Sequence, residues 1–160
     1  MTTPAEFVTL LSRTHWIMTE QAKGLTHEDS VRQLPFRGNC FNWVLGHILE
    51  SRSRMLGILG HEPFFSEAET ALYKRGSAPI TDGDTAVPFP TLLHHLNDSQ
   101  EKLIAYFQQA MPEDLAVETD SDNWPTLLSR VSFFHWHETY HVGQLEILRQ
   151  LAGTDDAIIK

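Results

Sequence analysis

The feature that most constrains the fold of this chain is the spacing of its apolar residues, which recur every three to four positions in four long stretches. That spacing is the period of an α-helix with one buried face, and no stretch shows the alternation typical of a β-strand. The pattern predicts helices over residues 4–23, about 40–59, 90–110 and about 124–152. Because such helices must bury their apolar faces against one another, we expect an all-α four-helix bundle.

The connection between the second and third predicted helices is unusually long. The second helix begins after Asn39, a good N-cap residue, and ends at Gly60. Residues 61–90 contain four prolines and two glycines, and only Ser66–Lys74 suggests a short helix there. We therefore expect a long crossover between helices 2 and 3, within a single domain that spans residues 1–160.

Charge and cysteine content limit the classes of partner. Lys and Arg number 12 against 21 Asp and Glu, and no basic stripe is visible, so nucleic acid and anionic membranes are poor partners. The lone Cys40 forms no internal disulfide, the first residues do not resemble a signal peptide, and no apolar run is long enough to span a bilayer. We expect a soluble cytoplasmic protein that acts on a small molecule.

The strongest local signal is a pair of histidines, His137 and His141, on the fourth predicted helix. Residues four apart on a helix lie about 40° apart around the axis and about 6 Å apart along it, so both imidazoles can reach one metal ion. Phe134 and Leu145 lie on the same face, which places the pair toward the apolar interior. The pair is therefore either a metal site or a hydrogen-bonded core histidine beside a partly exposed one.

The same segment also spells the H-E-x-x-H pattern of zinc metalloproteases, in which Glu138 would be the general base. We reject this interpretation because the 19 residues after His141 contain neither His nor Cys to complete the metal site. We expect no peptidase activity. Any third ligand must lie upstream.

Several upstream residues are candidates for that third ligand. His47 is notable because Trp43, Ser51 and Arg54 give its flank an unusually polar character for a helix that packs in a bundle. His15 is as compatible with a packed core residue as with a metal ligand. Cys40 lies too far along the helix to share a metal with His47. The full set of candidates is His15, His47, His61, His94, His95 and Glu50.

Two segments together resemble the DinB/YfiT-like superfamily: NCFNWVLGHILESR, and about 90 residues later HETYHVGQLEILRQLAG. In that family one histidine of the second helix and an H-x3-H pair of the fourth bind a divalent metal inside a four-helix bundle. The matching positions are His47, His137 and His141. The resemblance implies a divalent metal, with Zn or Ni favoured, and an enzyme that uses a low-molecular-weight thiol as cosubstrate for transfer to a small electrophile.

Three imidazole ligands leave a coordination position open, which is the arrangement of catalytic sites. In this interpretation Glu138 or Glu50 handles a proton, and Arg54 meets an anionic group of the substrate. The alternatives are that Glu138 is a salt-bridge partner or an acceptor for a ligand imidazole, and that Arg54 pairs with Glu50. A hydrolase that uses bound hydroxide and a non-catalytic metal-binding or ligand-binding bundle are the alternative functions.

Homodimer formation is predicted from apolar residues that point away from the histidines. Leu45, Leu49 and Leu56 lie opposite His47 on the second predicted helix, and Trp136 lies away from the metal face of the fourth. If exposed, they would form the kind of patch that marks an interface, so we expect a symmetric homodimer, as the resembled family often forms. The alternative is that the crossover, with Phe64, Phe65 and Phe89, covers them within one chain.

Overall fold

The computed structural model describes residues 2–154, 156 and 158, and within them the chain is all-helical, as expected. No β-strand occurs among these residues, only an isolated bridge between Glu118 and Thr126. The elements in chain order are α1 Pro4–Ala22, α2 His27–Ser30, α3 Phe41–Ile58, α4 Glu67–Tyr73, the 3₁₀ turn Gly83–Thr85, α5 Phe89–Gln109, α6 Pro112–Leu115 and α7 Leu127–Leu151.

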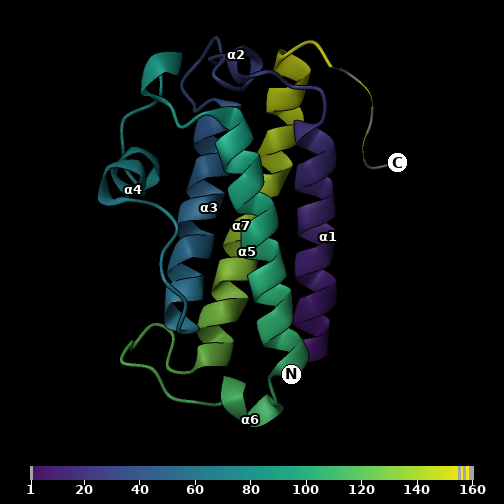
Figure 1. The fold of residues 1–160 in the computed structure, drawn as a ribbon, viewed down its shortest axis with the longest axis vertical. Helices are drawn as coiled ribbons and strands as arrows, with labels where there is room; N and C mark the ends of the chain where they lie inside the picture. Colours follow the sequence, from purple (N-terminus) through teal and green to yellow (C-terminus); the bar gives the residue numbers. More distant parts are fainter. Residues whose placement is uncertain (1, 155, 157, 159–160) are drawn as a thin grey trace.

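The four long helices α1, α3, α5 and α7 run side by side (Figure 1). Helices α1 and α3 each pack against both α5 and α7, so the four helices enclose a common interior. The crossover between α3 and α5 carries α4, which lies beside α3 on the outside of this group. The arrangement places α3 next to α7, the two helices that carry the predicted metal ligands.

Helix ends follow the local sequence closely, with three differences from the expectation. The residue before α3 is Cys40 rather than Asn39, and it makes no side-chain capping bond. Helix α7 begins at Leu127, because the Thr126 hydroxyl accepts the Ser129 N–H and caps the helix after Pro125. The third difference is the short helix α6, which was not expected and begins at Pro112, where the missing N–H of proline costs nothing.

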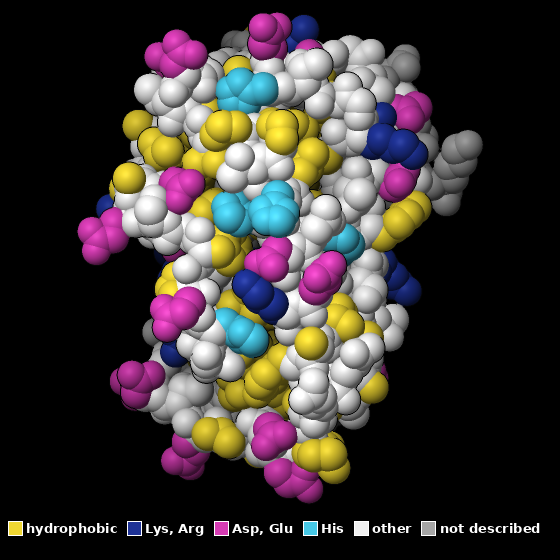
Figure 2. Space-filling view, viewed as in Figure 1, with side chains coloured by type: hydrophobic (Ala, Val, Ile, Leu, Met, Phe, Trp, Pro, Cys, Tyr) yellow, Lys and Arg dark blue, Asp and Glu magenta, His cyan; other side chains and the backbone are white. Residues whose placement is uncertain are grey.

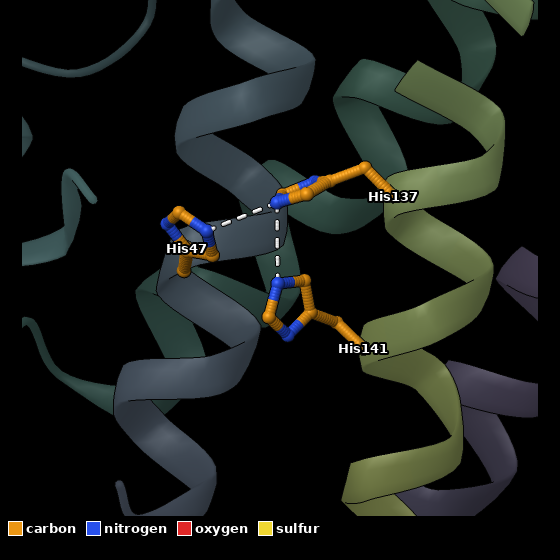
Figure 3. A group of neighbouring side chains, drawn as sticks. All are labelled: His47, His137 and His141. Atoms are coloured by element: carbon orange, nitrogen blue, oxygen red, sulfur yellow. Dashed lines mark hydrogen bonds between the residues drawn. The ribbon is translucent and has the colours of Figure 1, made fainter. Parts of the chain in front are cut away.

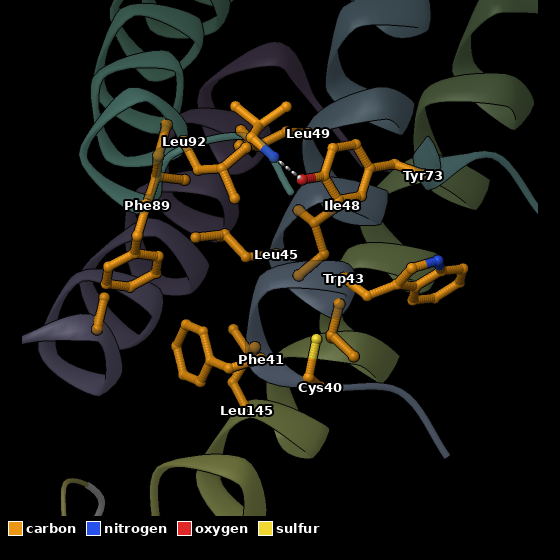
Figure 4. Close-up of a cluster of buried hydrophobic side chains, with 14 of the residues drawn as sticks. Cys40, Phe41, Trp43, Leu45, Ile48, Leu49, Tyr73, Phe89, Leu92 and Leu145 are labelled. Carbon is orange, nitrogen blue, oxygen red and sulfur yellow. Dashed lines mark hydrogen bonds between the residues drawn. The ribbon is translucent and has the colours of Figure 1, made fainter. Parts of the chain in front are cut away.

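The interior contains two clusters of buried apolar side chains, one of which Figure 4 shows around α3. Leu45, Leu49 and Leu56 are fully buried in these clusters. Phe65 and Tyr73 of the crossover belong to the same cluster as Leu45 and Leu49, together with side chains of α5. The prediction that these leucines form an exposed interface strip is therefore wrong, since the chain covers them itself.

A buried ion pair joins the helices near the middle of the interior. Arg52 of α3 donates through Nε to Oε2 of Glu138 of α7 at 2.6 Å and through a terminal nitrogen to Oε1 at 3.0 Å. The Thr14 hydroxyl of α1 donates to the same carboxylate, and Arg52 also donates to Ser99 of α5 at 3.3 Å. One network therefore links all four long helices.

The surface is consistent with the acidic composition of the chain. Figure 2 shows acidic side chains spread over the visible face, with scattered basic ones. A search of the described residues found no helix with the length and apolar character needed to cross a membrane.

We predict that Glu138→Gln destabilises the protein by about 3–5 kcal/mol, because it leaves the buried guanidinium of Arg52 without a counter-charge. Urea unfolding followed by circular dichroism measures this loss. The matched control is Asp98→Asn, which breaks the exposed pair between Asp98 and Lys102 and should cost less than about 1 kcal/mol.

The double variant Arg52→Met/Glu138→Leu distinguishes a lost counter-charge from general damage to the core. Replacing both charges with apolar groups of similar size should recover most of the stability that Glu138→Gln loses. A double variant no more stable than Glu138→Gln would contradict this account of the pair.

Candidate metal centre

The side chains of His47 on α3 and of His137 and His141 on α7 point toward one another (Figure 3). The Nε2 atom of His137 lies 3.1 Å from Nε2 of His47 and 3.1 Å from Nε2 of His141. The structure thus brings together the three histidines selected from the sequence. His47 is buried, and the other two are half-buried.

The second nitrogen of each ring contacts another polar group. His47 Nδ1 lies 2.7 Å from the carbonyl oxygen of Tyr73, and since a carbonyl only accepts, Nδ1 carries the proton and Nε2 is bare. His141 Nδ1 lies 2.7 Å from Oε1 of Gln144, which fixes the same tautomer. His137 Nδ1 lies 3.4 Å from the Ser51 hydroxyl. Such contacts orient metal-ligating histidines in proteins.

These tautomers leave lone pairs facing one another. A proton on Nε2 of His137 can satisfy only one of its two neighbours, so at least one contact between Nε2 atoms opposes two lone pairs. A cation among the three atoms removes this repulsion. With metal–nitrogen bonds of about 2.0–2.1 Å, nitrogens 3.1 Å apart subtend about 100° at the metal, which fits tetrahedral or octahedral ligation. The residues present therefore fit a divalent metal.

The imidazoles are held in the neutral form that ligation requires. Burial lowers the pKa of all three, and for His137 burial together with the neighbouring His141 and His47 lowers the pKa to about 4. Neutral rings can donate a lone pair to a metal without a net loss of a proton from the imidazolium form, and the Nε2 atoms of His47 and His141 are already bare.

The crossover positions His47. Its acceptor, the Tyr73 carbonyl, belongs to the last turn of α4, where carbonyl groups lack partners within the helix. The Tyr73 hydroxyl donates to Asn42 at 2.7 Å and accepts the Val87 N–H at 3.0 Å, which anchors this residue from its other end. Its ring packs on Gly46, where a Cβ would come within 2.3 Å of the ring.

The three histidines line a cavity of about 900 Å³ between α3, α7 and the loops at either end. Trp43 stacks on the His47 ring at 4.9 Å, and Tyr140 lies at the wall with most of its side chain exposed. Glu50, Ser51 and Arg54 also line the cavity. The polar flank noted in the sequence of the second helix is therefore one wall of the cavity.

The three predicted helper residues lie in two different places. Glu50 is buried at the cavity wall, its pKa is raised by burial, and Arg54 lies 3.8 Å from it, so the expected pairing of these two is present. Glu138 does not line the cavity and holds Arg52 in the interior. This position favours a role for Glu138 as a salt-bridge partner over a role as a proton carrier. It is also unsuited to the general base of a zinc metalloprotease.

The other histidines considered as third ligands lie outside the group formed by His47, His137 and His141. His61 and His95 are half-buried and His94 is exposed. His15 lies on α1 beside the ion pair, and burial together with the charge of Arg52 lowers its pKa to about 4.

Sequence analysis did not identify three residues that help to form the site: Tyr73, Gly46 and Arg130. Tyr73 and Gly46 act through the fold of the crossover on α3, a contact between segments 27 residues apart that no local pattern records. Arg130 lines the cavity two turns before His137. That spacing, on the face of the metal pair, is a signal that could have identified it.

Comparisons with known proteins identify the family of the chain and a solved structure with a similar fold. The family model described as the DinB superfamily matches residues 10–145. A crystal structure of a conserved protein from Enterococcus faecalis has a similar fold, with a TM-score of 0.72 and 19% identity over 96% of this chain and 99% of that one. None of the curated proteins matches the chain.

We predict that Gly46→Ala lowers zinc affinity at least about tenfold, because the added methyl displaces the Tyr73 ring and with it the acceptor of His47. Competition with a chromophoric chelator measures the affinity. The control is Gly57→Ala in the same helix, where a Cβ meets no atom within 4 Å.

The control should keep the zinc affinity and gain about 0.5–1 kcal/mol of stability, since alanine favours the helix over glycine. Equal zinc affinities for the two variants would show that the packing of Tyr73 on Gly46 does not position His47.

We also predict a pH effect at His15. At pH values between the ordinary pKa of 6.5 and the lowered pKa of about 4, His15 binds a proton in the unfolded chain but not in the folded protein. Stability is therefore lost as pH falls through that window, by a contribution on the order of 2 kcal/mol. His15→Leu should make the free energy of unfolding fall less steeply from pH 7 to pH 4.5, and parallel curves for the two proteins would contradict the assignment.

Proposed function

Because this chain belongs to the DinB superfamily, we propose that it is a four-helix-bundle enzyme in which a divalent metal held by His47, His137 and His141 activates a low-molecular-weight thiol for transfer to a small electrophile. The observation that carries the proposal is the convergence of three Nε2 atoms at the wall of a large cavity. We propose Zn or Ni as the metal and the cytoplasm as the location.

A metal held by His47, His137 and His141 would lower the pKa of a thiol or water bound to it, which would supply a nucleophile near neutral pH. Three protein ligands leave a coordination position for such a molecule. The volume of the cavity, about 900 Å³, supports the presence of two small molecules together, the thiol and its electrophilic partner.

Glu50 is the residue best placed to move a proton. It lines the cavity, and burial raises its pKa, which brings the carboxyl closer to the pH at which it can both accept and release a proton. In the transfer, the thiol proton passes to Glu50, sulfur forms a bond to the electrophilic carbon, and the leaving group departs with the bonding electron pair and takes up the proton.

Two cavity residues orient the reactants. Arg54 has most of its side chain exposed and pairs loosely with Glu50, so its guanidinium is available to an anionic group of the substrate. Trp43 is fixed by a hydrogen bond from its Nε1 to Ser77 at 2.9 Å and by stacking on His47, and it gives the cavity a rigid apolar wall.

The proposal of a homodimer now rests on α7 alone. Trp136, Tyr140 and Ile147 are each about 60% exposed, and helical spacing places them on one face. All three also line the cavity beside the histidines, so the prediction that Trp136 lies away from the metal face is wrong. Large apolar side chains that remain exposed in this way are typical of an interface, and a second copy of the chain is our proposed occupant.

We predict that His47→Ala, His137→Ala and His141→Ala each reduce bound metal to a small fraction of one equivalent, because two imidazoles bind a divalent ion far more weakly than three. Metal analysis of untagged protein after dialysis measures the content. His94→Ala, an exposed histidine outside the site, is the matched control and should keep full content. Full metal content in any of the three site variants would place the metal elsewhere.

Activity assays separate the proposed function from hydrolysis. The metal-loaded protein should consume an activated aryl halide only when a low-molecular-weight thiol is present, and Glu50→Gln should slow this reaction with the metal still bound. Turnover of aryl esters without any thiol would instead show a hydrolase. Failure of both reactions with a panel of thiols would favour a non-catalytic metal-binding protein.

A further inference from the structure

The cavity beside the three histidines is lined by cationic groups although the chain as a whole is acidic, with a net charge of −9. Four of the eight arginines of the chain line it, whereas Glu50 is the one acidic lining residue in the part of the chain that the structure describes. These arginines are Arg37, Arg54, Arg75 and Arg130. A cationic cavity in an anionic protein concentrates anions from solution and holds them against the overall charge.

Two of the arginines, one on α3 and one on α7, line the cavity and lie toward the same end of it. Helices α3 and α7 are antiparallel, since the His47 ring lies beside the His141 ring, while Ser51, one turn further along α3, contacts His137, one turn earlier on α7. Arg54 lies seven residues after His47, and Arg130 lies seven residues before His137. Seven residues are two helical turns, so both arginines lie on the face of the histidines and about 10 Å from them in the same direction.

Both guanidinium groups retain unused hydrogen-bond donors. The Nε of Arg130 is buried and has no hydrogen-bond partner among the described residues, and the ion pair of this residue with Asp120 is long, at 3.9 Å, with Asp120 99% exposed. Arg54 lies 3.8 Å from Glu50, also beyond hydrogen-bond distance. By contrast, the interior Arg52 makes four hydrogen bonds, two to Glu138, one to Ser99 and one to the Leu96 carbonyl.

The space between the arginines and the histidines has an apolar floor. Phe133 lies within 6.1 Å of the His137 ring and stacks roughly parallel to it, and Trp124 packs on Phe133 at 4.6 Å. Both rings line the cavity. A ligand that spans the distance from the histidines to the arginines therefore contacts imidazole nitrogens at one end, aromatic rings along its length and two guanidinium groups at the other end.

We infer that the cavity binds an organic acid whose carboxylate is held between Arg54 and Arg130 while its other end reaches the three histidines. Paired guanidinium groups match the geometry and charge of a carboxylate, and an aromatic floor matches a short apolar spacer. The identity of the other end as a thiol rests on the proposed function, whereas the carboxylate site does not. Arg54 and Arg130 are then the residues that determine specificity for an acid over a neutral compound.

The test compares two thiols that differ only at the far end, ω-mercaptohexanoate and ω-mercaptohexanol. They are titrated into the cobalt-substituted protein, where thiolate binding gives a strong near-ultraviolet absorption. We expect the acid to bind at least about tenfold more tightly than the alcohol, as charge-assisted hydrogen bonds from two arginines imply.

Variants assign this preference to the two arginines. Arg54→Gln and Arg130→Gln should each reduce the preference for the acid several-fold, and the double variant should abolish it, with alcohol affinity unchanged. Arg13→Gln, which removes the same charge from an exposed position on α1 outside the cavity, should keep the preference. Equal affinity for acid and alcohol in the unaltered protein would overturn the inference and leave the proposed thiol chemistry intact.

A metal-free measurement keeps the two proposals separable. Calorimetric titration of the metal-free protein with hexanoate and with hexanol tests the arginine pair alone. Binding of hexanoate but not hexanol, lost in the double variant, supports the carboxylate site even if neither thiol binds cobalt. No binding of hexanoate to the metal-free protein, together with no acid preference in the cobalt protein, would overturn it.

Discussion

The buried ion pair between Arg52 and Glu138 is the interaction on which the rest of the structure depends. It links α3 to α7 in the interior and recruits Thr14 from α1 and Ser99 from α5. Because a buried charge without its partner is costly, α3 and α7 cannot slide past each other without a large penalty. This register places His47 opposite His137 and His141, and the polar interior therefore fixes the geometry of the site.

The crossover makes an equally specific contribution. Its helix α4 ends with the Tyr73 carbonyl against His47, and Gly46 leaves room for the Tyr73 ring. The same segment covers the apolar face of α3 that would otherwise require a partner. A region that the sequence identifies only as a long connection is therefore both part of the core and the support of one metal ligand.

The regular part of this structure could be predicted from the sequence because it depends on local spacing. Apolar periodicity located the long helices to within a few residues, and the spacing of His137 and His141 indicated a shared target. Contacts between distant segments could not be predicted this way. Glu138 shows the difference, since it follows His137 directly yet faces the interior, where only the packed structure supplies Arg52.

The central claim is that His47, His137 and His141 together bind one divalent metal. X-ray absorption spectroscopy of the zinc-loaded protein tests it most directly, because imidazole rings give a characteristic outer-shell scattering pattern. We predict three imidazole nitrogens at about 2.0–2.1 Å, with the remaining coordination supplied by a light atom from solvent. A first shell with two or fewer imidazoles, or one that is unchanged in His47→Ala, would contradict the claim.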